Sequence, residues 1–218
     1  MPDAPATTIQ RRTFVVGVSG ASGAAYALRL LEILLEQGHE VHLVVSEYGK
    51  RLLFDEAGIK RIELADMLPE LAKKADAGEG PVDGGYNLIC HPNKDVGAVI
   101  ASGSFLHDGM AVLPCSSTSL GAIATGAGSN LLTRAAMVTL KERRPLIVCH
   151  RESPLNLIDI ENMRTLALAG AINCPTNPGF YLLPKTVEEI IDFMVGKVLD
   201  LLRVEHDLKT RWEDAEQQ

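Results

Sequence analysis

A glycine-rich turn follows the first run of β-branched residues in the chain. Residues 13–18 (TFVVGV) lead into residues 20–23 (GASG), and a helical pattern begins directly afterwards. Glycines let the backbone approach a ligand closely, and the first amides of a helix carry about half a positive charge. The turn therefore predicts a phosphate cradle. It is not a GxGxxG motif, because Ser19 stands where the middle glycine would be, and a tight structural turn explains the same residues.

A run of hydroxyl side chains follows a later apolar segment. Residues 109–114 lead into Cys115 and then residues 116–119 (SSTS). Four adjacent hydroxyl groups at a strand end are hard to explain as core, and they suit an anion that needs several neutral donors. Helix capping would account for one or two of them. Cys115 could be a nucleophile, but no general base is evident near it.

Charged side chains follow two further apolar segments. Arg151 and Glu152 come just after residues 145–149, and Ser46 follows residues 40–45, with Glu56 ten residues later. A carboxylate beside a strand-end arginine is a candidate proton-handling group, and the arginine could bind a phosphate. The alternatives are a surface Arg–Glu ion pair, a helix N-cap at Ser46 and a solvated carboxylate at Glu56.

The remaining candidates lie in the second half of the chain. Arg134 and Lys141 are seven residues apart, two turns along one helix face, and residues 143–144 are expected to serve the C-terminus of that helix. Residues 178–181 (PGFY) form a predicted turn with two aromatic rings. Lys197 and Trp212 lie near the end of the chain, where Trp212 could instead be a hydrophobic anchor.

Several familiar motifs are missing from the sequence. It has no HExxH or paired-cysteine motif for a metal, no DDxxD cluster, no GxSxG elbow and no GxxxxGK[ST] loop. The residues therefore predict a metal-free site rich in phosphate-binding groups. Such a site suits two anions, or one large phosphorylated cofactor together with a phosphorylated substrate.

These residues must be positioned by alternating strands and helices. We expect strands at 13–18, 40–45, 87–90, 109–114, 145–149 and 171–174. We expect helices at 24–35, in pieces over 52–71, and at 131–144, 159–168 and 186–204, with a capping box at Thr186 and Glu189 and a surface loop at 73–85. This alternation predicts an α/β fold with a mostly parallel sheet, and ligands of such sheets bind beyond the carboxyl ends of the strands.

Composition limits the class of protein. The 218 residues are 46% hydrophobic, which suits one domain, and the net charge of −7 argues against a nucleic-acid partner. The four cysteines form no CxxC pair, residues 1–12 lack the apolar core of a signal peptide, and no apolar run approaches the length of a membrane span. We therefore expect a cytoplasmic protein with no membrane partner, having a flexible segment at 1–12, one domain at 13–205 and a tail at 206–218 that packs on a neighbouring subunit.

Short stretches along the chain, in the same order, resemble the UbiX-type flavin prenyltransferase family. They are 17–24 (GVSGASGA), 101–104 (ASGS) with 108–110 (DGM), 114–117 (PCSS), 124–126 (ATG), 141–146 (KERRPL), 151–152 (RE), 161–163 (ENM) and 178–181 (PGFY). The resemblance implies a flavodoxin-like or Rossmann-like three-layer sandwich and a homo-oligomer, commonly a dodecamer. It also implies a metal-independent enzyme that joins a dimethylallyl group from dimethylallyl phosphate to N5 and C6 of reduced FMN, making prenylated FMN for a UbiD-type decarboxylase.

The resemblance also assigns roles to individual residues. FMN would be held by Gly20, Ala21, Ser22, Ser46, Ser116, Ser117, Thr118, Ser119 and Arg134. The dimethylallyl phosphate would be surrounded by Lys141, Arg151, Glu152, Tyr181 and Lys197, where Lys197 stands in place of an arginine found in some relatives. Glu56 and Glu152 would assist proton movements, and Trp212 would close the site.

Two rival functions share the expected flavin pocket. A flavin-dependent cysteine decarboxylase would typically carry a PASANT stretch and a catalytic histidine, whereas residues 114–119 here read PCSSTS. A non-catalytic FMN carrier within a decarboxylase complex would need the FMN residues but not the second set of phosphate-binding groups. The presence of that second set favours prenyl transfer.

Overall fold

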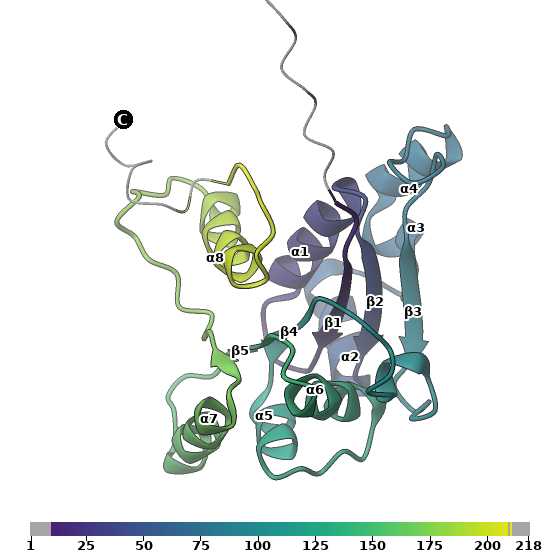
Figure 1. Cartoon of the computed structure of the whole chain (residues 1–218). Helices are drawn as coiled ribbons and strands as arrows, with labels where there is room; N and C mark the ends of the chain where they lie inside the picture. Colours follow the sequence, from purple (N-terminus) through teal and green to yellow (C-terminus); the bar gives the residue numbers. More distant parts are fainter. Residues whose placement is uncertain (1–9, 209, 211–218) are drawn as a thin grey trace, which may run out of the picture.

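The computed structural model describes residues 10–208 and 210 and contains a six-stranded sheet (Figure 1). The strand order is β3-β2-β1-β4-β5-β6, and each neighbouring pair is parallel. The strands are β1 (Thr13–Val18), β2 (Glu40–Val45), β3 (Leu88–Pro92), β4 (Gly109–Cys115), β5 (Leu146–His150) and β6 (Ile172–Asn173). The predicted parallel sheet is confirmed, with the strand order of Rossmann folds.

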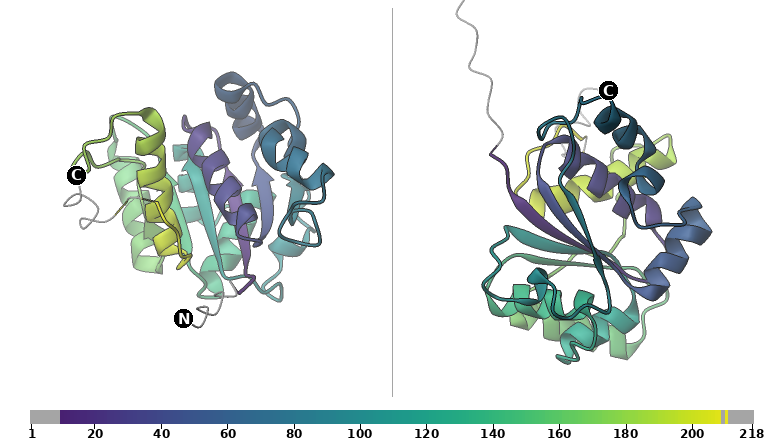
Figure 2. Two further views of the ribbon diagram at one scale, coloured as in Figure 1. Left: turned by 90° about the horizontal axis from the view of Figure 1, so that it is seen from above. Right: turned by 90° about the vertical axis from the view of Figure 1, so that its right-hand side faces the viewer.

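Helices cover both faces of the sheet, which gives the expected three layers (Figure 2). They are α1 (Ala24–Glu36), α2 (Glu47–Ala57), α3 (Leu64–Met67), α4 (Pro69–Asp76), α5 (Ser117–Ala124), α6 (Leu131–Lys141), α7 (Leu157–Ala169) and α8 (Val187–Leu201), with a 3-10 turn η1 at Val99–Ala101. The core under α1 and α8 and the core under α5 and α6 are separate clusters on opposite faces.

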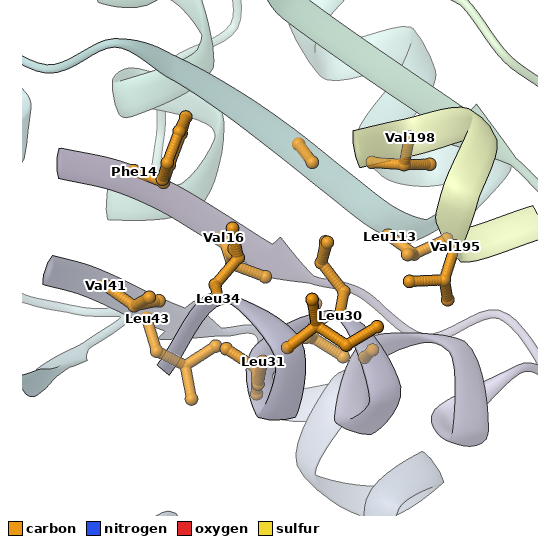
Figure 3. Close-up of a cluster of buried hydrophobic side chains, with 14 of the residues drawn as sticks. Phe14, Val16, Leu30, Leu31, Leu34, Val41, Leu43, Leu113, Val195 and Val198 are labelled. Atoms are coloured by element: carbon orange, nitrogen blue, oxygen red, sulfur yellow. The ribbon is translucent and has the colours of Figure 1, made fainter. Parts of the chain in front are cut away.

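The central strands are buried on both faces, which explains why their sequences do not alternate between apolar and polar residues. Val16 packs under α1 and α8 with Leu34 and Val198 (Figure 3), whereas its neighbour Val15 belongs to the cluster under α6. Adjacent residues of a strand point to opposite faces, so a doubly covered strand needs apolar side chains at every position. No helix within residues 10–208 and 210 is long and apolar enough to cross a membrane.

The structure corrects several expected elements. Strands β1 and β2 have the predicted bounds, but the predicted loop at 73–85 is wrong at its start, because α4 continues to Asp76. Helix α5 was not predicted, since it is only eight residues long and its start coincides with the hydroxyl run. The capping box at α8 is half formed: Thr186 accepts from Glu189 N, but the Glu189 carboxylate accepts from Lys185 N.

The order of the strands fixes where a ligand can bind. The chain moves outward from β1 through β2 to β3 and then returns to β4 on the other side of β1. The connections after β1 and β4 therefore diverge to opposite faces, and the carboxyl ends of these two strands form the topological switch point where such sheets bind ligands. The domain limits at residues 13 and 205 stay predictions.

Candidate functional site

Ser19 joins the carboxyl ends of β1 and β4. Its side chain is fully buried, and its hydroxyl accepts a hydrogen bond from Ser116 N at 2.8 Å and donates to Pro114 O at 3.2 Å. The Ser19 amide also donates to Pro114 O at 3.1 Å. The turn after β1 and the start of α5 are thereby held side by side. Sequence reasoning noted Ser19 only as a departure from a glycine motif, although a polar residue between a buried strand and a glycine turn is a signal for such a tether.

The turn after β1 needs a glycine at position 20 for lack of space. A Cβ atom on Gly20 would lie 2.4 Å from the Cβ of Tyr48, at the start of α2. Gly23, the residue before α1, has φ 129°, a conformation that L side chains rarely adopt. The two glycines thus let the turn pass close to α2. Ser22 lies on the exposed side of the turn, and Ala21 is half-buried.

Glu56 from α2 occupies the start of α1, which sequence reasoning did not foresee. Its Oε2 accepts hydrogen bonds from Gly23 N at 3.0 Å and Ala24 N at 2.9 Å. Burial alone would raise the pKa of this carboxyl group, but hydrogen bonds from Ser22 and these amides, together with the Arg151 charge, lower its pKa overall. Glu56 is therefore an ionised acceptor, and the positive end of α1 already has a carboxylate on it.

The positive end of α5 faces the same edge of the sheet. Ser116 caps this helix by accepting from Ser119 N at 3.3 Å, and its hydroxyl donates to the Ser119 hydroxyl at 3.3 Å. Ser117 lies 3.0 Å from His150 Nε2, and Thr118 is exposed. The first amides of a helix have no acceptor within it, so the start of α5 offers backbone donors, with the Thr118 hydroxyl, to an anion.

Ser46 is the N-cap of α2, which is the alternative that the sequence left open for this residue. Its hydroxyl accepts from Gly49 N at 3.0 Å, just after β2. A Cβ on Gly49 would lie 2.5 Å from Val18 O, so the start of α2 packs directly on the end of β1. The half-buried Ser46 hydroxyl can still donate to a ligand at the edge formed by β1 and β2.

Arg151 and Glu152 extend this edge beyond β5. Arg151 N donates to Cys115 O at 3.0 Å, and both side chains are exposed. Within the described chain they form no ion pair with each other; the Glu152 carboxylate accepts from Ser153 N at 3.0 Å instead. The Arg151 charge also acts on Tyr26 in α1, whose pKa is raised by burial and partly lowered again by that charge. Tyr26 is a second residue near the site that the sequence did not single out.

Cys115 is unsuited to nucleophilic chemistry. Its thiol is fully buried, and desolvation raises its pKa to about 12, in spite of a hydrogen bond with Ser19. A nucleophilic cysteine requires a lowered pKa and access to substrate. In the part of the chain that the structure describes, no group of three or more His, Cys, Asp or Glu side chains could hold a metal ion.

Tyr181 and Lys197 form a second group beside β6. The Tyr181 hydroxyl donates to Thr210 O at 3.1 Å, and its ring meets the Phe193 ring edge-on at 5.6 Å. Lys197 Nζ lies 5.8 Å from the centre of the Phe193 ring. The pKa of Cys174, just after β6, is lowered by its hydrogen bond with Cys149 and by the Lys197 charge. This group therefore lies near Cys174, just beyond β6.

Lys141 does not join either group within one chain. Helix α6 begins beside Asn93, beyond the carboxyl end of β3, and its last residues lead into the amino end of β5. Arg134, in the first turn of α6, is exposed at the carboxyl edge, and Lys141 lies seven residues further, or about 10 Å along the axis. Lys141 pairs with Glu142 instead. Trp212 lies outside the described residues.

Comparison with known proteins gives a consistent group of relatives. Residues 3–199 match the family model described as Flavoprotein. The chain is 44% identical over 205 residues to the flavin prenyltransferase UbiX of Halalkalibacterium halodurans, covering 94% of this chain and 95% of that protein.

Solved structures agree with this sequence similarity. A crystal structure of AnUbiX in complex with FMN and dimethylallyl pyrophosphate has a TM-score of 0.77 at 34% identity, covering 90% of this chain and 94% of that one. A dodecameric FMN-dependent UbiX-like decarboxylase from Escherichia coli has a TM-score of 0.79 at 36% identity, covering 92% and 98%. The FMN-dependent cysteine decarboxylase TvaF shares only the fold, at 14% identity and a TM-score of 0.55.

Proposed function

This chain belongs to the UbiX-type flavin prenyltransferases, and we propose that its reaction takes place at the carboxyl ends of β1, β4 and β5. The reaction joins a dimethylallyl group to FMN, so FMN is the prenyl acceptor as well as the ligand that fills the pocket. The Ser19 tether carries the placement of this site, because it holds the turn at Gly20 and the first turn of α5 on one edge.

The residues at this edge fit FMN. A side chain at Gly20 would clash with Tyr48, so only glycine lets the backbone of this turn keep its place beside the proposed flavin site. The positive end of α5 would hold the FMN phosphate with Ser116, Ser117, Thr118 and Ser119, while Ser46 and Arg134 supply further donors. Gly20, Ala21 and Ser22 would line the flavin. Reduced FMN, when bound, supplies the nucleophilic ring atoms N5 and C6 that receive the prenyl group.

A second set of cationic and hydroxyl groups would bind the dimethylallyl phosphate. Arg151 stands at the end of β5, and Tyr181 and Lys197 lie beside β6. Charge-assisted hydrogen bonds contribute about 1.5–3 kcal/mol each, so several of them can neutralise a departing monophosphate without a metal ion. Arg151 would bind the phosphate most directly, because it is exposed at the edge where the FMN groups gather.

The position of Lys141 indicates a site shared between subunits. It lies at the opposite end of α6 from Arg134, so it can reach a phosphate held by Arg151 only from a neighbouring chain. We propose that the protein assembles as a homo-oligomer, with the dodecamer of the Escherichia coli relative as the expected form. The tail at 206–218, including Trp212, would contribute to the same boundary.

The two carboxylates have different proton-handling roles in this proposal. Glu56 has a lowered pKa and two backbone amides on one oxygen, so it stays ionised and assists as a hydrogen-bond acceptor rather than as a proton donor. Glu152 is exposed beside Arg151, and its carboxylate has one amide partner, from Ser153. Glu152 is thus the carboxylate that is free to exchange a proton with the reacting groups.

The product and its destination complete the proposal. Prenylated FMN would be released to a UbiD-type decarboxylase. The four free cysteines suit the reducing conditions of the cytoplasm, which we propose as the compartment.

The direct test is to incubate the purified protein with reduced FMN and dimethylallyl monophosphate under anaerobic conditions and to weigh the released flavin by mass spectrometry. We expect a flavin heavier by one five-carbon unit, and a Glu152→Gln protein that binds FMN but forms this product more slowly. Recovery of unmodified, tightly bound FMN from the native protein would contradict the proposal and favour a cysteine decarboxylase or an FMN carrier.

A further inference from the structure

A hollow of about 220 Å³ lies at the amino edge of β5 and β6, at the opposite end of the sheet from the candidate site. Its cationic walls are Arg143, Arg144 and Arg203, and its apolar walls include Leu140, Ile172 and Leu201. None of the residues that line it carries a negative charge. The nearby Glu142, whose pKa is lowered by Lys141 and to a smaller extent by Arg144, is already paired with Lys141. The three arginines therefore still make a local cationic site in a chain of net charge −7.

The backbone around this hollow is strained at two of its arginines. Helices α6, α7 and α8 all end here, each followed by a residue with positive φ: Arg143 (59°), Gly170 (101°) and Arg203 (57°). Glycine is the usual residue at such a position, because an L side chain disfavours this conformation. Only α7 follows that rule. Strained backbone conformations cluster at binding and catalytic sites, so the two arginines are candidates for a binding function.

Capping of the helix ends does not account for these two side chains. The two carbonyls that directly follow α8 accept hydrogen bonds from Arg12, at 3.0 Å for Leu202 O and 2.8 Å for Arg203 O. Arg144, which was expected to serve the end of α6, donates instead to Phe105 O and Gly103 O, both at 2.8 Å. Within residues 10–208 and 210, the guanidinium groups of Arg143 and Arg203 make no hydrogen bond and no ion pair.

The charges at the hollow favour an anion even after the helix ends are counted. Each helix C-terminus carries about half a negative charge, so three of them offset about half of the three arginine charges. The remaining positive charge faces a cavity with apolar walls. An anion with an apolar body can use both features, since a planar carboxylate or a phosphate pairs well with guanidinium groups.

We propose that this hollow binds a small organic anion. Its carboxylate or phosphate head lies between Arg143 and Arg203, and its apolar body packs against Ile172 and Leu201. The site is separate from the FMN edge, because it is at the other end of the strands. Binding there involves no residue assigned to prenyl transfer.

The test uses the FMN-loaded protein, with benzoate and inorganic phosphate as separate probes in isothermal titration calorimetry. The variant is Arg143→Gly combined with Arg203→Gly, in which glycine accepts the positive φ at both positions. We expect native protein to bind benzoate more tightly than phosphate, and the double variant to lose about tenfold or more in benzoate affinity. We expect its melting temperature to be unchanged or raised.

The control is Arg164→Gln, which removes an exposed arginine of α7 that pairs with Glu161. It should bind benzoate like the native protein. Equal benzoate affinity in the native protein and the double variant would overturn the proposal, and so would an equal loss in the control. Phosphate binding as tight as benzoate binding would show that an apolar body of the ligand contributes nothing to binding, which contradicts the proposal. A lowered melting temperature of the double variant would show that the arginines support the fold instead.

Discussion

Replacing Ser19 with alanine removes the hydroxyl group that tethers β1 to β4 and leaves little else changed. In the native chain this hydroxyl accepts from Ser116 N at 2.8 Å and donates to Pro114 O at 3.2 Å. Pro114 O keeps the bond from the Ser19 amide at 3.1 Å, so the Ser116 amide is the group that loses its partner. Ser116 is the N-cap of α5, so the perturbation acts directly on the proposed phosphate-binding turn.

The size of the effect follows from that single orphaned donor. An unsatisfied buried amide costs about 1–3 kcal/mol, so we expect the free energy of unfolding to fall by this amount. FMN binding requires the first turn of α5 to be in its native position in our proposal. The free energy of FMN binding therefore weakens by at most the same amount. That limit corresponds to a loss of about 5- to 150-fold in the association constant.

Urea unfolding of the FMN-free protein measures the first quantity, and quenching of flavin fluorescence on titration measures the second. Thr139→Ala is the matched control, because it also removes a buried hydroxyl, which donates to Ala135 O at 2.8 Å within α6. The control should lose stability and keep its FMN affinity. Native FMN affinity in Ser19→Ala, or equal weakening in both variants, would refute the idea that the tether positions the FMN site.

Three further variants test neighbouring parts of the site. The pKa of Glu56 is lowered below its ordinary value of 4.5, so its hydrogen bonds stabilise the fold above that pH, and this contribution is lost as pH falls through the lowered pKa. Glu56→Gln should therefore flatten the fall of the melting temperature below about pH 5. An unchanged fall of the melting temperature in acid would count against this role. Gly20→Ala should weaken FMN binding in the same titration, because its Cβ would lie 2.4 Å from the Tyr48 Cβ. The control Gly97→Ala, whose new Cβ has its nearest atom 3.4 Å away, should bind FMN like the native protein. Equal FMN affinities of the two variants would show that the close approach of Gly20 to Tyr48 does not shape the FMN site. Tyr181→Phe should raise KM for dimethylallyl phosphate by about fivefold and leave FMN affinity unchanged, and the reverse order would place Tyr181 in the FMN pocket.

The regular elements could be predicted because local sequence carries their signals. Strands β1 and β2 were predicted with the observed bounds, since doubly buried strands are short apolar runs ended by polar residues or glycine. Helix α5 escaped prediction, because its first turn consists of the same hydroxyl residues that indicated an anion site. One short segment serves both purposes here, and composition alone does not separate capping from binding.

The candidate site was predictable as a set of residue types but not as an arrangement. The turn at Gly20 and the hydroxyl run after β4 were identified from their positions at strand ends. The role of Glu56 was not, because its partners Gly23 and Ala24 lie more than thirty residues away in the sequence. Arg134 and Lys141 lie two turns apart in α6, as their spacing predicts, but only the packing of α6 shows that the helix carries them toward opposite edges of the sheet.

The sequence by itself determined the α/β class, the parallel sheet, the family and the edge of the sheet where chemistry is expected. Those conclusions depend on local periodicity and on short motifs, which are properties of neighbouring residues. Only the tertiary structure decided that Ser19 ties β1 to β4, that Glu56 occupies the start of α1, and that three helices end around a cationic hollow. These features are contacts between residues distant in the chain, and such contacts arise from how the strands are ordered and how the helices pack on them.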